Sequence, residues 1–223
     1  MIERISTGIC RLDDSIGGGV PKSLVTAISG PIGIGKTCMG WQFLKTGLYV
    51  DESVLLLTSK DPPELLLQTA SALGYELGWA LDQHRLFIVD WRNVLSDGSL
   101  ASDWVKTFLN RIQSLIDEHG IKRIVFDALL PIGSVDATAV QIFYRSIQHQ
   151  LSEQYSGVSI WVLMSEPFPQ AFERALPFDT WIQLDWTDTE PRQRTLRIQK
   201  MPCTAIPSQA FTFDIIKGEG IVI

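Results

Sequence analysis

Apolar runs of strand length alternate with segments of helical period from residue 24 to residue 165. The runs are nearly continuous in Val, Ile and Leu, which is typical of strands whose two faces are both covered by helices. They predict strands at Leu24–Ser29, Val54–Ser59, Leu86–Val89, Ile124–Asp127 and Val158–Ser165. The segments between them predict helices at Lys36–Tyr49, Pro63–Leu73, Asp103–His119 and Asp136–Tyr155. The pattern therefore predicts an α/β fold with a mostly parallel central sheet flanked by helices.

The last third of the chain has a different pattern, with short strands and no room for helices between them. These strands are expected at Thr180–Asp185, Thr195–Lys200, Ala210–Ile215 and Ile221–Ile223, with a turn at Asp188–Pro191. Strands joined by short turns pair antiparallel, so we expect them to extend the sheet. The sequence shows no internal repeat or linker, and 223 residues with 45% apolar content suit one domain over residues 1–223.

A glycine-bearing segment between the first predicted strand and its helix matches the phosphate-binding pattern G-x-x-x-x-G-K-[ST]. The glycines allow successive backbone N–H groups to surround an anion, and the new helix adds its positive dipole end. The alternative is a glycine turn that binds no phosphate and is followed by an incidental lysine. The pattern assigns nucleotide binding to Gly30, Pro31, Ile32, Gly33, Ile34, Gly35, Lys36, Thr37 and Cys38.

A magnesium ion on such a loop needs the loop hydroxyl and a carboxylate on a neighbouring strand. Thr37 supplies the hydroxyl, and Asp127 follows three apolar residues where a buried strand should end. We assign both to the metal, Asp127 through water; an ordinary strand-ending aspartate is the alternative. The loop binds phosphates rather than the base, so ATP is expected while GTP stays open.

Charge and hydropathy limit the classes of partner that the sequence predicts. The formal net charge is −6 and no segment forms a basic tail, so the overall field disfavours nucleic acid as a partner. No apolar stretch is long enough to cross a bilayer, which predicts no membrane partner and a cytoplasmic location. The three cysteines and three histidines are scattered without metal-ligand spacing. The basic cluster Arg192, Arg194, Arg197 and Lys200 favours a solvated hairpin or a subunit contact over a DNA path.

Segments at both ends of the chain resemble one known family. Ile5–Ile9, Leu12-Asp13 and Gly17–Pro21 precede the phosphate loop, and Leu196–Met201 and Phe211–Ile223 close the chain. These segments are similar to those of KaiC-like ATPases of the RecA superfamily. The resemblance implies a RecA-like P-loop fold, ATP and Mg²⁺ as cofactors, and a homo-oligomer, with a hexameric ring possible.

The chain departs from this family after the second predicted strand. Family members resemble one another in a pair of glutamates that position and activate the attacking water, and Lys60 and Asp61 stand at those positions. The Asp61 carboxylate is one methylene further from the water than a glutamate, and a misplacement of about 1 Å can slow catalysis around a hundredfold. Glu64 lies beyond two prolines, where it favours the dipole of the next helix.

A second departure concerns the contact between subunits. In the family a lysine and, two residues later, an arginine reach the neighbouring γ-phosphate; this chain has Lys200 but Pro202. Loss of a trans arginine can reduce the rate about 10³- to 10⁵-fold. Lys200 is thus a candidate trans cation, with a structural, edge-protecting lysine as the alternative.

The intact loop beside altered catalytic positions favours an oligomeric ATP-binding protein with slow hydrolysis and nucleotide-dependent assembly or partner binding. Two alternatives remain: a competent ring ATPase that uses Asp61 as its base, and a DNA-binding protein of the recombination-mediator type.

Overall fold

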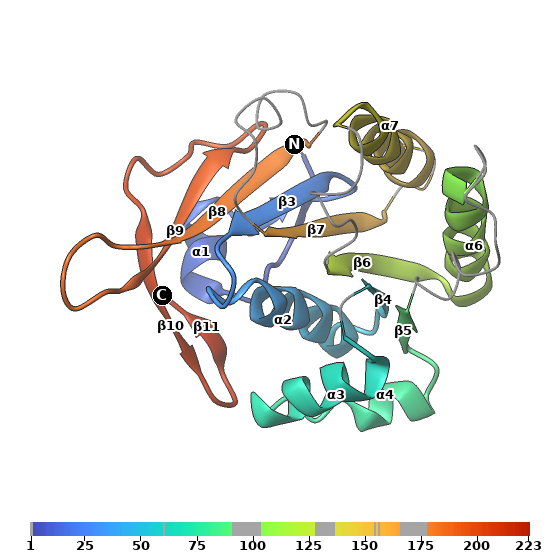
Figure 1. The fold of residues 1–223 in the computed structure, drawn as a ribbon, viewed down its shortest axis with the longest axis horizontal. Coiled ribbons are helices and arrows are strands. Elements are labelled where there is room, and N and C mark those ends of the chain that lie inside the picture. Colours follow the sequence, from blue (N-terminus) through green and yellow to red (C-terminus); the bar gives the residue numbers. More distant parts are fainter. Residues whose placement is uncertain are drawn as a thin grey trace.

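A computed structural model describes residues 2–59, 61–90, 104–127, 137–153, 155, 157–165 and 178–223. Its main sheet has nine strands (Figure 1). They are β3 (Val25–Gly30), β4 (Ser53–Thr58), β5 (Leu86–Asp90), β6 (Ile121–Asp127), β7 (Ser159–Ser165), β8 (Thr180–Trp186), β9 (Arg194–Lys200), β10 (Phe211–Ile216) and β11 (Gly220–Val222). Their order is β11-β10-β9-β8-β3-β7-β6-β4-β5.

The pairing confirms the predicted fold class. Strand β3 lies between β7 and β8 and is parallel to both, and parallel pairing continues through β6 and β4 to β5. Strands β8, β9, β10 and β11 pair antiparallel in succession. The sequence predicted β8 only as part of the antiparallel extension, whereas its other edge pairs in parallel with β3.

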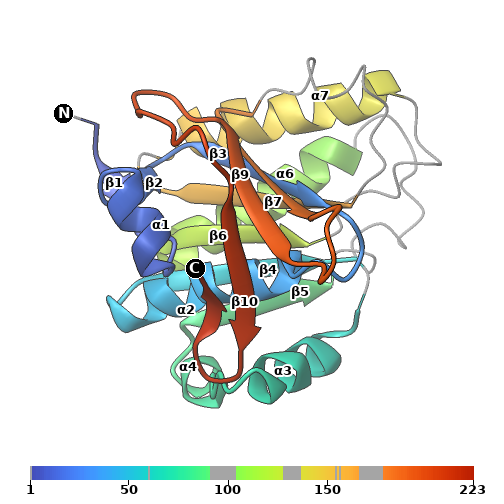
Figure 2. The same ribbon diagram turned by 90° about the vertical axis from the view of Figure 1, so that its left-hand side faces the viewer.

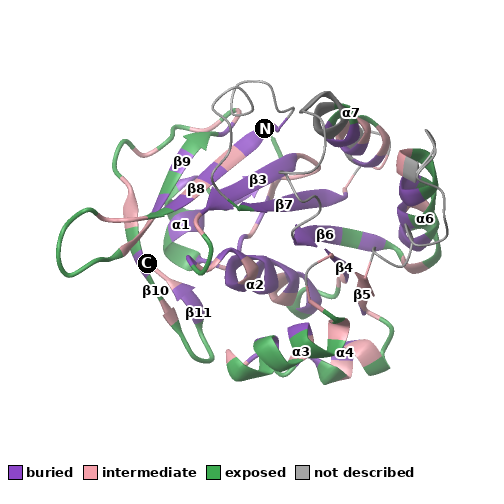
Figure 3. Ribbon diagram, in the orientation of Figure 1, coloured by how far each residue is buried: buried purple, intermediate pink, exposed green. Residues whose placement is uncertain are grey.

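Helices cover both faces of the sheet (Figure 2). One face carries α1 (Cys10–Ser15), α2 (Lys36–Tyr49), α3 (Pro63–Ala72) and α4 (Gly78–Asp82), whose apolar side chains form one core with the strands. The other carries α6 (Trp104–His119), α7 (Ala137–Ile147) and the π-helical segment η1 (Gln148–Glu153), which form a second core. The burial colours of Figure 3 follow this layering, since the central strands are buried and the outer sides of α3 and α6 are exposed. None of the described helices is long and apolar enough to span a bilayer.

Several elements differ from the sequence prediction. Strand β6 begins at Ile121 rather than Ile124, because the buried Arg123 interrupts the apolar run that marked it. Arg123 donates to Glu52 at 2.6 Å and to the carbonyl oxygens of Ser6 and Phe43, so its charge is paired inside the protein. Strand β5 is an edge strand and is mostly half-buried, although its sequence resembled a central strand.

The chain before the phosphate loop also contains structure that periodicity missed. Two short strands, β1 (Arg4–Ile5) and β2 (Val20–Pro21), precede and follow α1 in the sequence and pair with each other antiparallel. The buried Asp13 carboxylate accepts hydrogen bonds from Ser6 Oγ, Thr7 N and Thr7 Oγ1. The Ser-Thr-Gly and Leu-Asp motifs of this segment are therefore joined by hydrogen bonds, which fix the conformation of the chain before β3.

Candidate nucleotide site

The loop between β3 and α2 has the backbone conformation that anion binding requires. Gly33 has φ of 81° and Gly35 has φ of 120°, in the left-handed region that favours glycine. Ile34 between them is buried and anchors the loop, whereas Ile32 at its tip is 76% exposed. The helix α2 begins at Lys36, directly after Gly35. The loop and the helix start thus line one hollow, and the positive end of a helix dipole at such a place favours an anion.

Lys36 is 8% exposed, and its ammonium group is held by its own loop. Its Nζ donates to the carbonyl oxygens of Gly30 at 2.7 Å and Pro31 at 2.8 Å. A buried ammonium group needs such partners, because an unpaired charge in the interior is very unfavourable. The contacts keep the cation beside the loop.

Thr37 and Asp127 lie together as the proposed metal assignment requires. Thr37 Oγ1 donates to Asp127 Oδ2 at 2.8 Å, across 90 positions of sequence. Asp127 is the last residue of β6 and is 8% exposed. Within the described ranges no group of three or more His, Cys, Asp or Glu side chains could hold a metal by itself. These two residues fit Mg²⁺ when phosphate oxygens complete the oxygen ligands.

The residues of the loop line a hollow of about 220 Å³. Asp127 and Ser165 close it from β6 and β7. Ser165 ends β7 and is the register partner of Gly30. The sequence had placed Ser165 on a strand without assigning it to the site. The carboxyl ends of parallel strands meet at one edge of the sheet, and this rule could have identified it.

Two side chains near the loop are shielded from solvent to different degrees, with Cys38 buried and Arg194 half-buried. The thiol of Cys38 is buried, which raises its pKa to about 11, while the positive charge of Arg194 opposes the rise. Arg194 lies 4.8 Å from the ring centroid of Trp186, and its Nε has no hydrogen-bond partner among the described residues. Arg194 is therefore half-buried within the hairpin of β8 and β9, whereas Arg192, Arg197 and Lys200 are exposed.

Comparison with known proteins identifies the family. The family model of the KaiC ATPase matches residues 5–223. The chain belongs to the KaiC family of ATPases. Membership makes it a RecA-like nucleotide-binding protein.

Individual relatives agree with this assignment. The chain is 25% identical over 232 residues to the circadian clock oscillator protein KaiC of Prochlorococcus marinus, covering 100% of this chain and 45% of that protein. It is 27% identical over 224 residues to KaiC of Acaryochloris marina, covering 96% of this chain and 42% of that protein. The chain thus spans about half the length of these curated relatives. A KaiC-like protein from the archaeon Pyrococcus horikoshii has the same fold, with a TM-score of 0.82 at 23% identity over 100% of this chain and 99% of that one.

Of the two residues at the family's glutamate positions, the structure describes Asp61, and Lys60 lies outside the described residues. Asp61 follows β4, whose last residue Thr58 is the register partner of Asp127. Thr58 Oγ1 accepts from the Asp61 backbone N–H at 3.4 Å and donates to the Asp61 carbonyl oxygen at 3.3 Å. Asp61 therefore lies at the same sheet edge as the metal pair, and its role as a base stays a prediction.

Lys200, by contrast, lies away from the loop. It pairs with Trp181 at the start of β8, and that end of β8 lies beside the middle of β3 rather than beside Gly30. Its Nζ donates to the carbonyl oxygen of Phe178 at 2.6 Å. Lys200 therefore does not belong to the hollow of its own chain.

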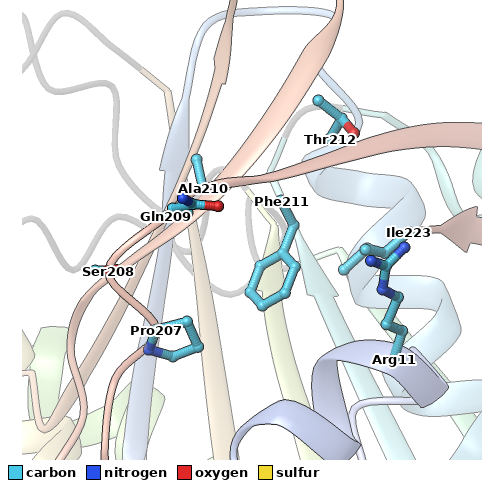
Figure 4. Close-up of a pocket in the computed structure, with 8 residues that line it drawn as sticks. All are labelled: Arg11, Pro207, Ser208, Gln209, Ala210, Phe211, Thr212 and Ile223. Carbon is cyan, nitrogen blue, oxygen red and sulfur yellow. The ribbon is translucent and has the colours of Figure 1, made fainter.

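A second hollow of about 400 Å³ lies near the carboxyl end of the chain (Figure 4). It is lined by Arg11, Pro207, Ser208, Gln209, Ala210, Phe211, Thr212 and Ile223. It is separate from the nucleotide hollow, although Phe211 begins the strand β10 that passes close to the loop.

The environment of Cys38 predicts that its thiol is alkylated slowly. Its pKa of about 11 keeps it protonated at pH 8, and burial hinders access, whereas Cys10 and Cys203 are exposed. We expect iodoacetamide at pH 8 to label Cys10 and Cys203 quickly and Cys38 slowly. Labelling of Cys38 should accelerate as the pH rises toward 11. Peptide mass spectrometry measures each rate, with Cys38→Ala as the control, and equal labelling of all three thiols at pH 8 would contradict the expectation.

Proposed function

We propose that the chain binds Mg-ATP at the loop Gly30–Thr37, assembles with copies of itself when nucleotide is bound, and hydrolyses ATP slowly. The observation that carries the proposal is the contact between Thr37 and Asp127 at 2.8 Å, beside the buried Lys36. The pair gathers a hydroxyl and a carboxylate at the place where a magnesium ion would bridge protein and phosphates. Lys36 would hold the terminal phosphates, and loop N–H groups would donate to the others.

The donor set fits a phosphate chain better than a neutral ligand. Of the described residues that line the hollow, Lys36 carries the positive charge and the loop contributes backbone donors. An anionic phosphate oxygen is a stronger acceptor than the neutral carbonyl oxygens that hold Lys36 now. Magnesium, when bound, would neutralise charge on the phosphates.

Lys36→Ala should abolish tight binding of Mg-ATP, because the variant loses the buried cation of the loop. Asp127→Asn should keep nucleotide binding but lose most of the gain in affinity that Mg²⁺ gives to the parent, because the amide cannot replace the carboxylate charge. Calorimetric titration with and without Mg²⁺ measures both effects. Lys217→Ala, which removes an exposed lysine, is the control. Unchanged affinity in Lys36→Ala would reject the site.

Slow hydrolysis is inferred from two positions around this site. Asp61 replaces a family glutamate, and its backbone is fixed by Thr58. Its shorter side chain reaches less far toward the attacking water. Pro202 replaces the family's second trans cation, and the remaining Lys200 is held by Phe178 of its own chain. Both changes act on hydrolysis and leave the binding loop intact.

Turnover by the parent should therefore be at least about 10³-fold below the ~10 per second typical of enzymes. Asp61→Asn should change this residual rate by less than about twofold, because Asp61 contributes little as a base. A coupled phosphate-release assay measures both rates, with Asp82→Asn on the exposed side of α4 as the control. A fast parent that Asp61→Asn slows strongly would instead establish a competent ATPase with Asp61 as base.

Self-association is inferred from the open side of the site. Ile32 at the loop tip is 76% exposed beside the hollow, and an apolar side chain at such a place suits coverage by another subunit. Lys200 does not reach the hollow of its own chain, so as a trans cation it would act on a neighbour's nucleotide after leaving the Phe178 carbonyl oxygen. A complete site would thus need two copies of the chain.

The native mass of the protein should increase with Mg-ATP, since nucleotide would fill the boundary between subunits and stabilise it. Light scattering or native mass spectrometry with and without Mg-ATP measures the assembly directly. Lys36→Ala should keep the nucleotide-free mass under both conditions. A parent mass that does not respond to Mg-ATP would contradict nucleotide-dependent assembly.

A further inference from the structure

The phosphate loop rests against the C-terminal hairpin of strands β10 and β11. A methyl group placed on the Cα of Gly35 would lie 2.8 Å from Ile215 Cδ1 and 3.8 Å from Phe213 Cε2. Gly35 is the last loop residue before α2, so the side chains of Ile215 and Phe213 on β10 pack against the end of the loop. Phe213 is buried and Ile215 is half-buried in the same core. The loop therefore contacts a strand that lies some 180 residues later in the sequence.

Ile215 is held in place by a contact that leads back to α2. It pairs with Ile221 of β11. The side-chain amide of Gln42 on α2 binds the backbone of Ile221 twice: its Oε1 accepts from Ile221 N at 2.7 Å, and its Nε2 donates to Ile221 O at 3.2 Å. Gln42 is 5% exposed, so these bonds are shielded from water.

Gln42 also ties the N-terminal segment to the same helix. Its Nε2 donates to the carbonyl oxygen of Gly8 at 2.7 Å. Gly220 packs directly against this side chain, and a methyl group on Gly220 would lie 2.6 Å from Gln42 Oε1. The hairpin tip is fixed as well, because Gly218 N donates to Leu73 O at the end of α3. The hairpin is thus attached to α2 and α3 and contacts the loop.

These contacts begin and end at α2. Gln42 of α2 binds β11, and β11 pairs with β10. Ile215 of β10 in turn packs against Gly35 at the start of α2. We propose that Ile215 and Gln42 are positioning residues for phosphate binding, acting through the conformation of the loop rather than by touching the ligand. The inference rests on the proposed nucleotide site. A residue that only stabilises the fold would leave the affinity of the folded protein unchanged.

Inorganic pyrophosphate and Mg-ADP together test this role. Pyrophosphate contains neither base nor ribose, so it reports the loop alone. Ile215→Ala removes the support behind Gly35, and Gln42→Met removes the amide bonds to Ile221 and Gly8 at similar volume. Each should weaken both ligands about tenfold. Ile215→Val should bind within about threefold of the parent, because most of the contact remains.

Ile216→Ala is the matched control, because Ile216 neighbours Ile215 on the strand but is 41% exposed. It should bind like the parent. Calorimetry gives the affinities, measured below the unfolding transition of each variant as followed by circular dichroism. Parent-like binding of pyrophosphate by Ile215→Ala or Gln42→Met would overturn the inference. So would a loss for Mg-ADP alone, which would mean that Ile215 contacts the nucleoside.

The outcomes also separate this inference from the proposed function. A parent that binds neither ligand, or a Lys36→Ala variant that binds both as the parent does, rejects the nucleotide site and the positioning role with it. A parent that binds both ligands, with variants that bind equally well, rejects only the positioning role.

Discussion

The central place of β3 in the sheet is the constraint on which the candidate site depends. Strand β3 is hydrogen-bonded to β7 on one side and β8 on the other, and both neighbours run parallel to it. Parallel strands bring their carboxyl ends to one edge, so the loop after Gly30 emerges beside Ser165 and one strand away from Asp127. The helices on both faces keep this edge in place, because every central strand is buried between two layers.

Two buried cations, Arg123 and Lys36, are stabilised by different groups. Arg123 is 2% exposed, and burial lowers its pKa while the carboxylate of Glu52 opposes the shift. Its partner is an anion of the protein itself, as a purely structural buried charge requires. Lys36 donates to neutral carbonyl oxygens of the loop, which a phosphate group would outcompete as acceptors. The first cation ties β6 to the start of β4, and under the proposed function the second would bind a phosphate.

The residues proposed for binding and for hydrolysis are only partly separated in space, because Asp61 lies at the same sheet edge as Thr37 and Asp127. The loop, Thr37 and Asp127 all lie at the carboxyl edge of the sheet, and each is supported by elements of the same chain. Lys200 lies at a different part of the sheet, where its ammonium group donates to the carbonyl oxygen of Phe178 in the same chain. Under the proposed function, affinity would therefore depend on the packing of one chain, whereas rate would depend on assembly.

The sequence was sufficient to predict those features that depend on residues close together in the chain. The phosphate loop follows from glycine and lysine spacing, and the parallel sheet follows from apolar runs that alternate with helical periods. The aspartate of the proposed metal pair was also predictable, because Asp127 ends an apolar strand. The beginning of β6 was not, since Arg123 interrupts the apolar pattern and is stabilised by Glu52, Ser6 and Phe43 from distant segments.

Contacts between distant segments could not be predicted, because they depend on how the strands are ordered in the sheet. The contact of Ile215 with Gly35, the bonds of Gln42 to Ile221 and the attachment of Lys200 to Phe178 depend on strand order and register. The same holds for Arg194, which is half-buried beside Trp186 within a hairpin whose other basic residues are exposed. Local spacing encodes backbone conformation, whereas contacts between distant segments exist only after the sheet has formed.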